Sequence, residues 1–507
     1  MKYEELKKLK SGSDVRGIAS EIISPVTLTD EAVYAIVRAF CLWHEKKYGR
    51  APGAVAVGHD VRISTDRILA QVLNAVTDAG LNAVNCGLCS TPSMFMLLKS
   101  DFGCDASIMI TASHLPSDRN GLKFFTREGG LGGGDIDEML KTAADAHFEN
   151  AKAQGSVETR SFMPEYCRSL VEKVREACGE KMPLAGKKIV VDAGNGAGGF
   201  FCTGVLEPLG ADTDGSINLE PDGTFPNHIP NPENKEAIDC LKGAVLKEKA
   251  DLGIIFDTDV DRAGAVDCDG KEINRNDLIA LASAMALENK KGTIVTDSVT
   301  SDGLTKFICG LGGKHLRFKR GYKNVIDEAV KRNAAGEYCP LAIETSGHAA
   351  FADNYFLDDG AYLVIRILIL LARQSAKGEK LGDIIKDLEH PAEEDEVRIS
   401  FNSLSKDFKL EGAYVIEELK RAAARRGLAL APDNYEGVKI NFGKGEGDGW
   451  LLLRMSVHDP VLPINFESNV CGGNRIIAEK LYDLIKGYEF LNTENLKKFI
   501  ENDREPN

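Results

Sequence analysis

The chain has 507 residues, 43% of them hydrophobic and 27% charged, and it carries a formal net charge of −15 at pH 7. This composition is typical of a globular protein with several domains, and no run of about 18 uncharged apolar residues indicates a membrane-spanning helix. The acidic balance opposes general attraction to nucleic acid or to an anionic membrane surface, so an anionic substrate would need a local cluster of arginine and lysine.

Two features of the sequence bear on the compartment. The N-terminal segment MKYEELKKLKSGSD has no apolar core of the secretory type. The twelve cysteines are scattered, and Cys86-x-x-Cys89 lacks the second pair that a zinc site would need. Reduced thiols are therefore expected, and the cytoplasm is the predicted compartment.

Strands and helices alternate along the first part of the chain. Thr29 is a candidate N-cap for one helix, and Gly80 is placed to end another in the left-handed conformation. Alternation with helices of about 10 to 15 residues indicates doubly wound α/β sheets with parallel strands. The expected elements are strands 54–57, 83–86 and 106–110, helices 29–44 and 67–79, and a flexible glycine-rich segment at 129–134.

Three segments share one pattern, an apolar strand followed by an acidic residue and small polar residues. They are 55–60, 188–196 and 293–301, and their similarity indicates three related α/β units. The apolar run 361–372 is too short to span a membrane and is expected to be a core helix. The charged stretch 390–396 is expected to be a linker before the last domain.

Strand 106–110 runs into a segment of small, polar and turn-forming residues that presents Ser113 on a loop. A serine hydroxyl is a weak nucleophile, so it needs a neighbouring base or acts as the carrier of a group already attached to it. His114 and Lys123 are within local reach. The glycines that flank a hydrolase serine are absent, which makes acyl transfer the poorer interpretation.

Three carboxylates follow the apolar strand 253–256 at a spacing of two residues, Asp257, Asp259 and Asp261. Carboxylate oxygens in this arrangement can converge on one hard cation, and without a counterion they would repel one another. The sixth and twelfth positions of the loop lack the glycine and glutamate of an EF-hand, so a calcium-buffering site is not expected.

Two later loops carry polar groups of a kind that can bind hydroxyl groups or phosphate, although each loop taken alone is more simply a polar loop. Glu344 and Ser346, at alternate positions after an apolar run, can accept from and donate to neighbouring hydroxyls. Strand 450–453 leads to Arg454 and Ser456, and arginine recognises phosphate with two parallel hydrogen bonds while serine adds a donor.

One segment of the sequence allows the interpretation that the protein is a dinucleotide-dependent oxidoreductase. Gly194-x-Gly196-x-x-Gly199 follows a strand and matches the glycine fingerprint of dinucleotide-binding folds. That fingerprint requires an acidic residue about 20 positions on, at the end of a second strand. Asp214 has the distance but follows no strand, which makes this reading the less favoured one.

Four segments together resemble the motifs of one family, the alpha-D-phosphohexomutases. Residues 111–123 resemble its T-A-S-H-N-P-x-x-x-N-G-x-K phosphoserine loop, 257–262 its D-G-D-x-D-R magnesium loop, 343–348 its G-E-x-S-G-H sugar loop, and 454–460 its R-x-S-[GN]-T-x-P phosphate loop. Segments 12–17 and 320–323 resemble its arginine-bearing G-T-D-x-R-G opening and a short glycine loop. The departures from the family pattern are Leu115, Thr258, Ile343, Val457 and His458.

The resemblance implies three similar doubly wound α/β domains and a C-terminal α+β domain around a central cleft. The implied domains are 1–160 with the phosphoserine loop, 161–275 with the metal loop, 276–395 with the sugar loop and 396–507 with the phosphate loop.

It also implies roles for individual residues. Catalysis would fall to Ser113, His114, Lys123, Arg16, Arg262 and Lys323. Mg²⁺ would be held by Ser113, Asp257, Asp259 and Asp261. Substrate would be bound by Glu344, Ser346, His348, Arg454, Ser456 and His458, with histidine at the last position where the family usually has threonine.

The function implied is a magnesium-dependent interconversion of hexose 1-phosphate and hexose 6-phosphate, with glucose or mannose as the sugar. It would pass through a phosphoserine enzyme and a hexose 1,6-bisphosphate, which would also be the activator. An aminosugar substrate, as for a phosphoglucosamine mutase, and a catalytically silent sugar-phosphate-binding homologue stay open as alternatives. Small sugar phosphates are the expected partners, with no nucleic acid and no membrane.

Overall fold

In the computed structural model, residues 2–20, 25–432, 434–456 and 459–501 are described. They form two compact units. The first comprises the chain up to Met285 together with Ser346–Ile384, and the second comprises Ala286–Thr345 and the chain from Ile385 onward. Among the helices of the described ranges, none combines the length and the apolar character needed to cross a membrane.

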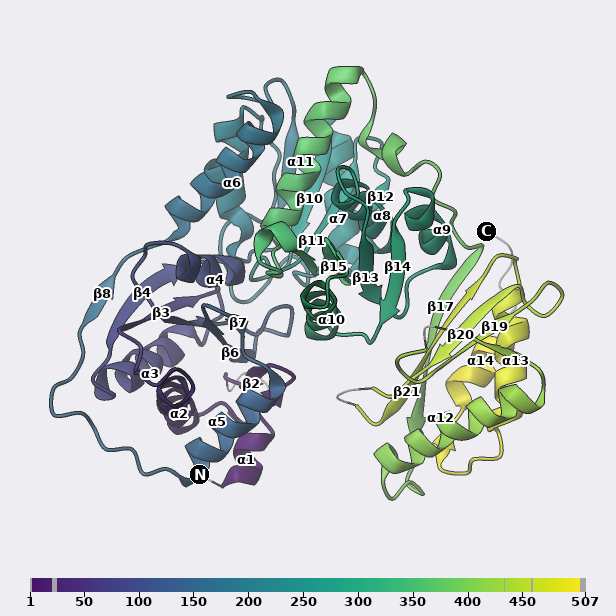
Figure 1. The fold of residues 1–507 in the computed structure, drawn as a ribbon, viewed down its shortest axis with the longest axis horizontal. Helices are drawn as coiled ribbons and strands as arrows, with labels where there is room; N and C mark the ends of the chain where they lie inside the picture. Colours follow the sequence, from purple (N-terminus) through teal and green to yellow (C-terminus); the bar gives the residue numbers. More distant parts are fainter. Residues whose placement is uncertain (1, 21–24, 433, 457–458, 502–507) are drawn as a thin grey trace. The chain divides into compact units, whose positions relative to one another are not determined.

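The helices alternate with strands over most of the chain (Figure 1). Those of the first unit are α1 (Tyr3–Lys7), α2 (Asp30–Tyr48), α3 (Thr65–Asp78), α4 (Thr91–Lys99), α5 (Gly133–Asp145), α6 (Met163–Cys178), α7 (Lys235–Glu248), α8 (Arg275–Ala286, ending one residue into the second unit) and α11 (Gly360–Lys377). Those of the second unit are α9 (Asp302–Gly310), α10 (Tyr322–Ala334), α12 (Phe408–Arg425), α13 (Gly473–Ile485) and α14 (Glu494–Glu501).

The N-terminal part of the first unit is built on an eight-stranded sheet. Its order is β1 (Lys10–Ser11), β2 (Asp14–Ile18), β6 (Arg119–Thr126), β5 (Ala106–Ile110), β3 (Ala54–His59), β4 (Asn82–Leu88) and β8 (Val157–Thr159), with β7 (Gly129–Gly130) beside β6. Strands β5, β3, β4 and β8 are parallel, as predicted, whereas β6 runs antiparallel to β5. The short loop 111–118 joins β5 to β6, and a connection of that length allows only an antiparallel pair.

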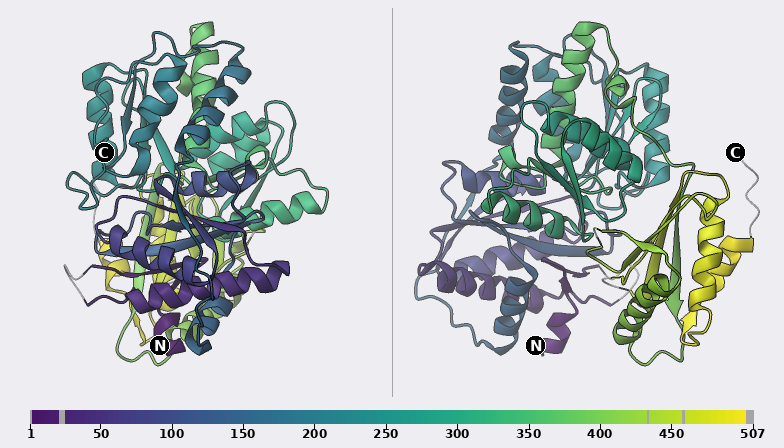
Figure 2. Two further views of the ribbon diagram at one scale, coloured as in Figure 1. Left: turned by 90° about the vertical axis from the view of Figure 1, so that its left-hand side faces the viewer. Right: turned by 45° about the vertical axis from the view of Figure 1, so that its right-hand side comes forward.

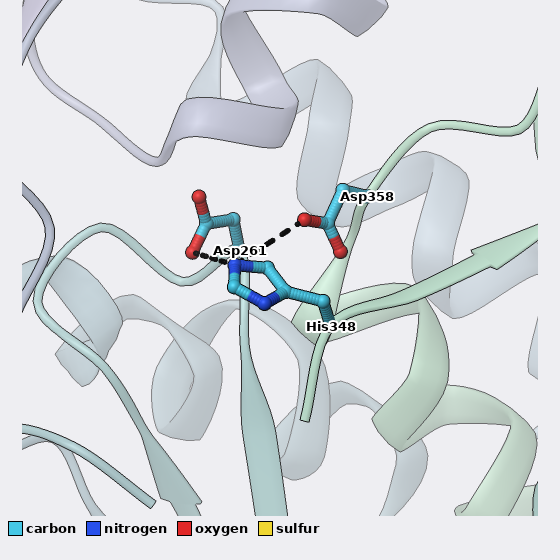
Figure 3. A group of neighbouring side chains, drawn as sticks. All are labelled: Asp261, His348 and Asp358. Atoms are coloured by element: carbon cyan, nitrogen blue, oxygen red, sulfur yellow. Dashed lines mark ion pairs between the residues drawn. The ribbon is translucent and has the colours of Figure 1, made fainter. Parts of the chain in front are cut away.

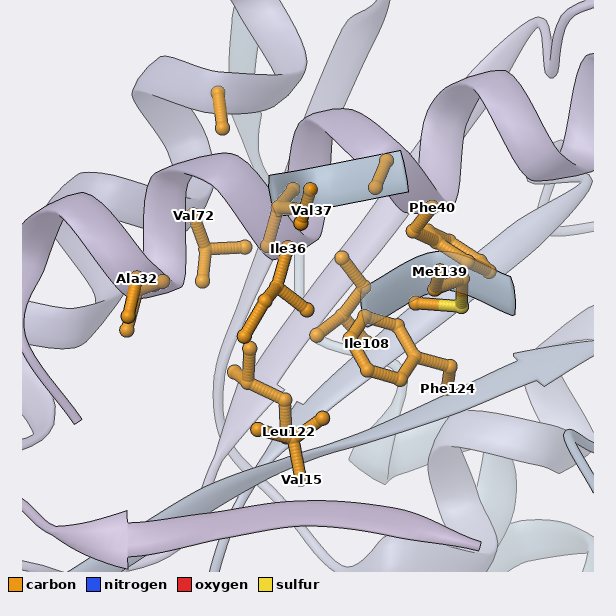
Figure 4. Packing of buried hydrophobic residues seen from close by; sticks show 14 of the residues in the cluster. Val15, Ala32, Ile36, Val37, Phe40, Val72, Ile108, Leu122, Phe124 and Met139 are labelled. Atoms are coloured by element: carbon orange, nitrogen blue, oxygen red, sulfur yellow. The ribbon is translucent and has the colours of Figure 1, made fainter. Parts of the chain in front are cut away.

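The core of this sheet is closed by α2, α3 and α5, whose apolar side chains pack on the strands (Figure 4). The ring of Phe40 on α2 lies 4.8 Å, centroid to centroid, from that of Phe124 on β6. The predicted helix beginning after Thr29 is confirmed, and it continues to Tyr48. The segment 129–134, expected to be flexible, instead forms β7 and the first turn of α5.

The second sheet of the first unit carries the triple-aspartate loop. Its order is β12 (Glu272–Ile273), β11 (Ala263–Asp267), β10 (Leu252–Phe256) and β9 (Ile189–Asp192). Strand β9 is parallel to β10, and β11 is antiparallel to β10. Residues 257–262 are therefore the connection of a hairpin, and all three aspartates lie at one end of the sheet.

The second unit contains two sheets of different type. Strands β14 (Lys314–Phe318), β13 (Thr293–Asp297) and β15 (Leu341–Ile343) are parallel, and β16 (Ala349–Phe351) follows in the first unit. The C-terminal sheet is antiparallel, and α12 and α13 lie together on one of its faces (Figure 2). Its order is β18 (Ala429–Leu430), β19 (Val438–Phe442), β20 (Gly449–Leu453), β21 (Val461–Ser468), β17 (Glu393–Phe401) and β22 (Leu491–Asn492).

The prediction of a linker at 390–396 is wrong, because β17 begins at Glu393 and pairs with β21. The charge on this segment has a structural use. The carboxylate of Glu393 accepts hydrogen bonds from the backbone N–H groups of Gly472 (2.7 Å) and Asn474 (3.0 Å) at the start of α13. A negative charge satisfies the free donors at a helix N-terminus and is attracted by the helix dipole.

We expect Thr29→Ala to destabilise the N-terminus of α2. The Thr29 hydroxyl accepts a hydrogen bond from the backbone N–H of Ala32 (3.2 Å), and loss of such a cap costs about 1 kcal/mol. Amide hydrogen exchange of the first turn of α2 should therefore be faster. Thr29→Ser keeps the acceptor and serves as the control; equal exchange in both variants would show that the cap contributes nothing.

Candidate active site

Ser113 lies in the turn that follows β5 and is buried, with 3% of its surface exposed. Its φ of +52° is in the left-handed region, which a residue other than glycine adopts at a cost and which is often associated with a functional site. The Oγ atom lies 3.0 Å from Asp257 Oδ2, 3.2 Å from a guanidinium nitrogen of Arg262 and 3.3 Å from Nδ1 of His114. The structure thus brings together four residues that the sequence analysis had selected.

The serine turn is held in place by Arg62, a residue that the sequence analysis did not select. Its guanidinium donates to four carbonyl oxygens of the turn, those of Ser113, Leu115, Pro116 and Arg119. Asp60 balances its charge, with Oδ2 at 3.3 Å from Nε, and also accepts a hydrogen bond from Thr111 (2.7 Å). Both side chains are fully buried, so the clamp works without competition from water.

The structure explains why position 121 is a glycine. A Cβ atom at this position would lie 2.7 Å from the carbonyl oxygen of Thr111, so only glycine lets β6 approach the start of the serine turn. Arg16 on β2 is paired in register with Gly121 and donates to Asp14 (2.9 Å). The expected active-site arginine therefore lies beside the serine turn.

The three aspartates after β10 are buried, and each offers a carboxylate oxygen within 4.8 Å of the others. The loop is strained at Val260, whose φ of +66° is exceptional for a β-branched residue. Asp259 and Asp261 each keep one buried carboxylate oxygen, Oδ1, that makes no hydrogen bond. A buried carboxylate oxygen without a hydrogen bond is costly, and a cation bound here would satisfy both.

The charges around this loop point the same way. Burial raises the pKa of Asp257 well above its usual range, the charge of Asp261 raises it further, and Arg262 opposes both. Burial also acts on Asp261, but Lys123 and Arg262 outweigh it and lower the pKa to about 2. The Nζ atom of Lys123 lies 2.5 Å from Asp261 and 3.2 Å from Asp259. An all-oxygen donor set with excess negative charge fits a hard divalent cation such as Mg²⁺.

Thr91, at the start of α4, is a second residue that the sequence analysis missed. Its backbone N–H donates to the carbonyl oxygen of Asp259 (2.9 Å), and its hydroxyl donates to Oδ2 of the same residue (2.5 Å). The sequence around Thr91 signals only a helix start, with Ser90 as N-cap. No local pattern could link it to a residue so far along the chain.

His348, from the expected sugar loop, lies beside the aspartate loop (Figure 3). Its Nε2 atom is 3.8 Å from Asp261 Oδ1 and 3.5 Å from Asp358 Oδ2, and its Nδ1 is 2.9 Å from the hydroxyl of Ser346. Asp358 had not been selected from the sequence. Burial, together with Arg262 and Lys123, lowers the pKa of His348 well below its usual value, so the ring is neutral.

His114 is neutral for the same reason. Burial, followed by the charges of Arg262 and Arg16, lowers its pKa to about 3. A neutral imidazole next to a serine hydroxyl can accept a hydrogen bond from it.

The remaining selected residues lie in the second unit. Glu344 accepts a hydrogen bond from the backbone N–H of Gly321 (2.6 Å), and Lys323 on α10 pairs with Asp327 (2.8 Å). Arg454 is buried to 8% exposure and its Nε makes no hydrogen bond. The hydroxyl of Ser456 accepts from the backbone N–H of Asp459 (3.2 Å), and His458 lies outside the described residues.

The glycine fingerprint has a different explanation from the one its pattern offered. A Cβ atom at Gly196 would lie 2.7 Å from the carbonyl oxygen of Thr258, so this glycine allows the aspartate loop to pack on the segment. The chain after it forms a 3₁₀ turn (Ala197–Gly199) and a π-helical turn (Cys202–Leu206) in place of the α-helix that would receive a pyrophosphate. The dinucleotide interpretation is wrong.

These features define a multidomain α/β enzyme with a buried serine beside a carboxylate site for a cation. Residues 7–151, 164–270 and 274–391 match domains I, II and III of phosphoglucomutase/phosphomannomutase, each described as an alpha/beta/alpha domain. The chain belongs to this family and is a phosphohexomutase, an isomerase. The predicted family is confirmed, and so is the fold class of three α/β domains followed by a C-terminal domain of sheet and helices.

Relatives match along most of the chain. A phosphoglucomutase of Neisseria gonorrhoeae is 31% identical over 458 residues, which are 90% of this chain and 92% of that one. A phosphomannomutase/phosphoglucomutase of Pseudomonas aeruginosa is 30% identical over 461 residues, 90% of each chain. The crystal structure of a phosphoglucomutase/phosphomannomutase family protein from Burkholderia thailandensis aligns with a TM-score of 0.78 at 26% identity, covering 96% of this chain and 98% of that chain.

We expect Arg62→Lys to loosen the serine turn. Lysine keeps the charge that Asp60 needs but cannot reach four carbonyl oxygens with a planar fork, and each lost hydrogen bond to a charged donor costs about 1.5 to 3 kcal/mol. Amide exchange across residues 113–119 should rise and turnover should fall. Arg119→Lys, at a half-exposed arginine of the same turn, is the control; equal exchange in the two variants would contradict the clamp.

Proposed function

We propose that the chain is a magnesium-dependent phosphohexomutase that interconverts hexose 1-phosphate and hexose 6-phosphate, with Ser113 as the phosphoryl carrier. The observation that carries this proposal is the convergence of Asp257, Arg262 and His114 on the Ser113 hydroxyl. A phosphoryl group on this oxygen would meet the cationic guanidinium and the cation site at once, which is the charge neutralisation that phosphoryl transfer requires.

The reaction begins with phosphorylated Ser113 and a bound hexose monophosphate. The bond between Ser113 Oγ and phosphorus breaks as a bond forms between phosphorus and the free sugar hydroxyl. The hydroxyl proton passes to Ser113 Oγ, and His114, whose lowered pKa keeps its ring neutral, lies in hydrogen-bond reach of that oxygen and orients it. The product is a hexose 1,6-bisphosphate, which returns its other phosphoryl group to Ser113 by the same exchange in reverse and also serves as the activator.

Asp257, Asp259, Asp261 and the phosphoryl group on Ser113 would hold Mg²⁺. When bound, the cation withdraws charge from the phosphoryl oxygens and so favours transfer. Arg262 holds the phosphoryl oxygens from the other side, and Lys123 assists at the reacting oxygen. Arg16 completes the positive charge beside the turn.

Substrate recognition is assigned to the later loops. Glu344, Ser346 and His348 orient the sugar hydroxyls, Arg454 and Ser456 hold the non-reacting phosphate, and His458 is proposed as a further donor to it. Lys323 is assigned as an acid or base partner. Buried Arg454, with its unbonded Nε, supports a phosphate at that position.

The names of the relatives support glucose and mannose as the sugars. A panel of hexose 1-phosphates, assayed with a catalytic amount of the 1,6-bisphosphate, decides between these and an aminosugar. We keep the four domains 1–160, 161–275, 276–395 and 396–507, and the cytoplasm as compartment, as part of this proposal.

We expect Ser113→Ala to abolish nearly all turnover, because no other group would carry the phosphoryl. In the unsubstituted protein, peptide mass analysis should find a fraction about 80 Da heavier at Ser113. Ser117→Ala, in the same turn, is the matched control and should keep both activity and the heavier peptide. Wild-type rates in Ser113→Ala would end the proposal.

A chelator should remove activity and Mg²⁺ should restore it, because three buried carboxylates need the cation's charge. Asp259→Asn should raise the Mg²⁺ concentration needed for half-maximal activity by tenfold or more, since removal of one charged ligand weakens a hard-cation site strongly. Asp269→Asn, at an exposed position past the far end of β11, should leave this requirement unchanged. Full activity in excess chelator would exclude the metal site.

A further inference from the structure

Asp192 and His228 form a buried pair at the end of β9, outside the active site described above. Both side chains are fully buried, and His228 Nε2 lies 2.8 Å from Asp192 Oδ2. The other oxygen of Asp192 accepts hydrogen bonds from the backbone N–H of Gly194 (2.9 Å) and the amide of Asn218 (3.0 Å). The carboxylate is therefore satisfied at both oxygens.

The ring of His228 faces an acceptor at each nitrogen. Its Nδ1 lies 3.0 Å from the carbonyl oxygen of Ile229, while Nε2 meets Asp192. The amide of Asn218 is also 3.2 Å from Nε2, but Asp192 is closer and takes a hydrogen bond from that amide itself. Both ring nitrogens must carry a proton to donate to Asp192 and Ile229, so the imidazolium fits this position. Burial opposes the charge, but the hydrogen bond and the charge of Asp192 outweigh burial and raise the pKa of His228.

A chain of hydrogen bonds leads from this pair to the active site. The carbonyl oxygen of Ile229 also accepts from the backbone N–H of Asn231 (2.8 Å). Oδ1 of Asn231 then accepts from a guanidinium nitrogen of Arg262 (3.2 Å). The other guanidinium nitrogens of Arg262 reach Asp257 and Ser113.

The loop between His228 and Asn231 is fastened on both sides. A Cβ atom at Gly194 would lie 2.7 Å from Pro230, so the glycine allows the loop to pack directly on the end of β9. Past Asn231, the carbonyl oxygen of Pro232 accepts from the amide of Asn274 (2.6 Å). The position of the Asn231 side chain is thus set by the fold.

We propose that Asp192, His228 and Asn231 are positioning residues that hold the Arg262 guanidinium toward Ser113. Arg262 lies among carboxylates, with its Nε also 3.9 Å from Asp261. Asn231 Oδ1, which also accepts from the backbone N–H of Glu233 (3.0 Å), offers a neutral acceptor to a different guanidinium nitrogen from those that contact Asp257, and so fixes the direction of the guanidinium. This inference rests on the proposed function, in which Arg262 contacts the phosphoryl group.

The first test compares Asn231→Ala with Asn231→Asp. Alanine removes the acceptor and should lower kcat about tenfold or more, the loss expected for one hydrogen bond to a charged group, with little change in KM for the hexose phosphate. Aspartate keeps an oxygen at the same place and should recover most of the rate. Asn227→Ala is the control, because exposed Asn227 lies in the same loop and donates to Asn195.

The second test addresses the pair itself. His228→Ala should lower kcat, and the double variant with Asn231→Ala should be no slower than the slower single variant, because both act through one path. His228→Gln keeps a donor toward Asp192 and should be partly active.

The dependence of kcat on pH distinguishes a positioning role of His228 from a purely structural one. The charged groups facing His228 are Asp192 on β9 and Glu236 on α7, and the pKa of His228 is raised. The ring therefore stays protonated to a higher pH than an ordinary histidine. The alignment of Arg262 is lost as the pH rises through that raised pKa. The difference in kcat between wild type and His228→Gln should therefore shrink at alkaline pH.

A wild-type kcat in Asn231→Ala, measured in a preparation whose wild type turns over and is phosphorylated at Ser113, overturns the positioning role and leaves the proposed function intact. A wild type without Ser113-dependent turnover overturns both. If His228→Ala does not fold, the two Asn231 variants decide alone.

Discussion

The structure of the first unit depends on the burial of three like charges next to a serine hydroxyl. Asp257, Asp259 and Asp261 repel one another in a site that excludes water, and burial strengthens that repulsion because the medium screens less. Arg262 and Lys123 supply two positive charges, and a cation would supply the rest. Thr91, Gly196 and the strained backbone at Val260 keep the carboxylates from moving apart to relieve the repulsion.

The same constraint explains how an acidic protein can handle phosphorylated sugars. The net charge of −15 repels an anion at long range, where salt screens it over about 8 to 10 Å. Within the site, the buried side chains of Arg262 and Lys123 offset part of the negative charge of the aspartates, and a bound cation would add the positive charge that attracts an anion. Burial therefore concentrates attraction where the reaction occurs.

Local pattern predicted a large part of this arrangement. The apolar runs before Ser113 and Asp257 form β5 and β10, and the residues that follow each strand meet because both loops leave the carboxyl ends of strands in one compact unit. Sequence pattern could not predict which residues from distant parts of the chain hold the site residues in place. Arg62, Thr91, Asp358 and Asn231 look like ordinary loop or helix-start residues, and only their contacts in three dimensions distinguish them. The predictions from the glycine fingerprint and from the charged segment at Glu393 were wrong for a related reason. Glycines that allow close packing look the same in a sequence as glycines that bind phosphate, and a glutamate that caps a helix looks the same as one in a linker.

Because Thr91 contacts Asp259, the cation site is complete only when the N-terminal sheet packs against the sheet that carries the aspartate loop. All three aspartates lie within one short loop, yet the residue that anchors the middle one and the lysine that balances two of them come from the N-terminal sheet and its helix. A fragment holding the aspartate loop alone would keep the ligands and lose both supports, so its carboxylates would prefer to take up protons or splay apart. Affinity for the cation is thus linked to the association of the two sheets, and ions present during synthesis would favour the joined form over the separated one.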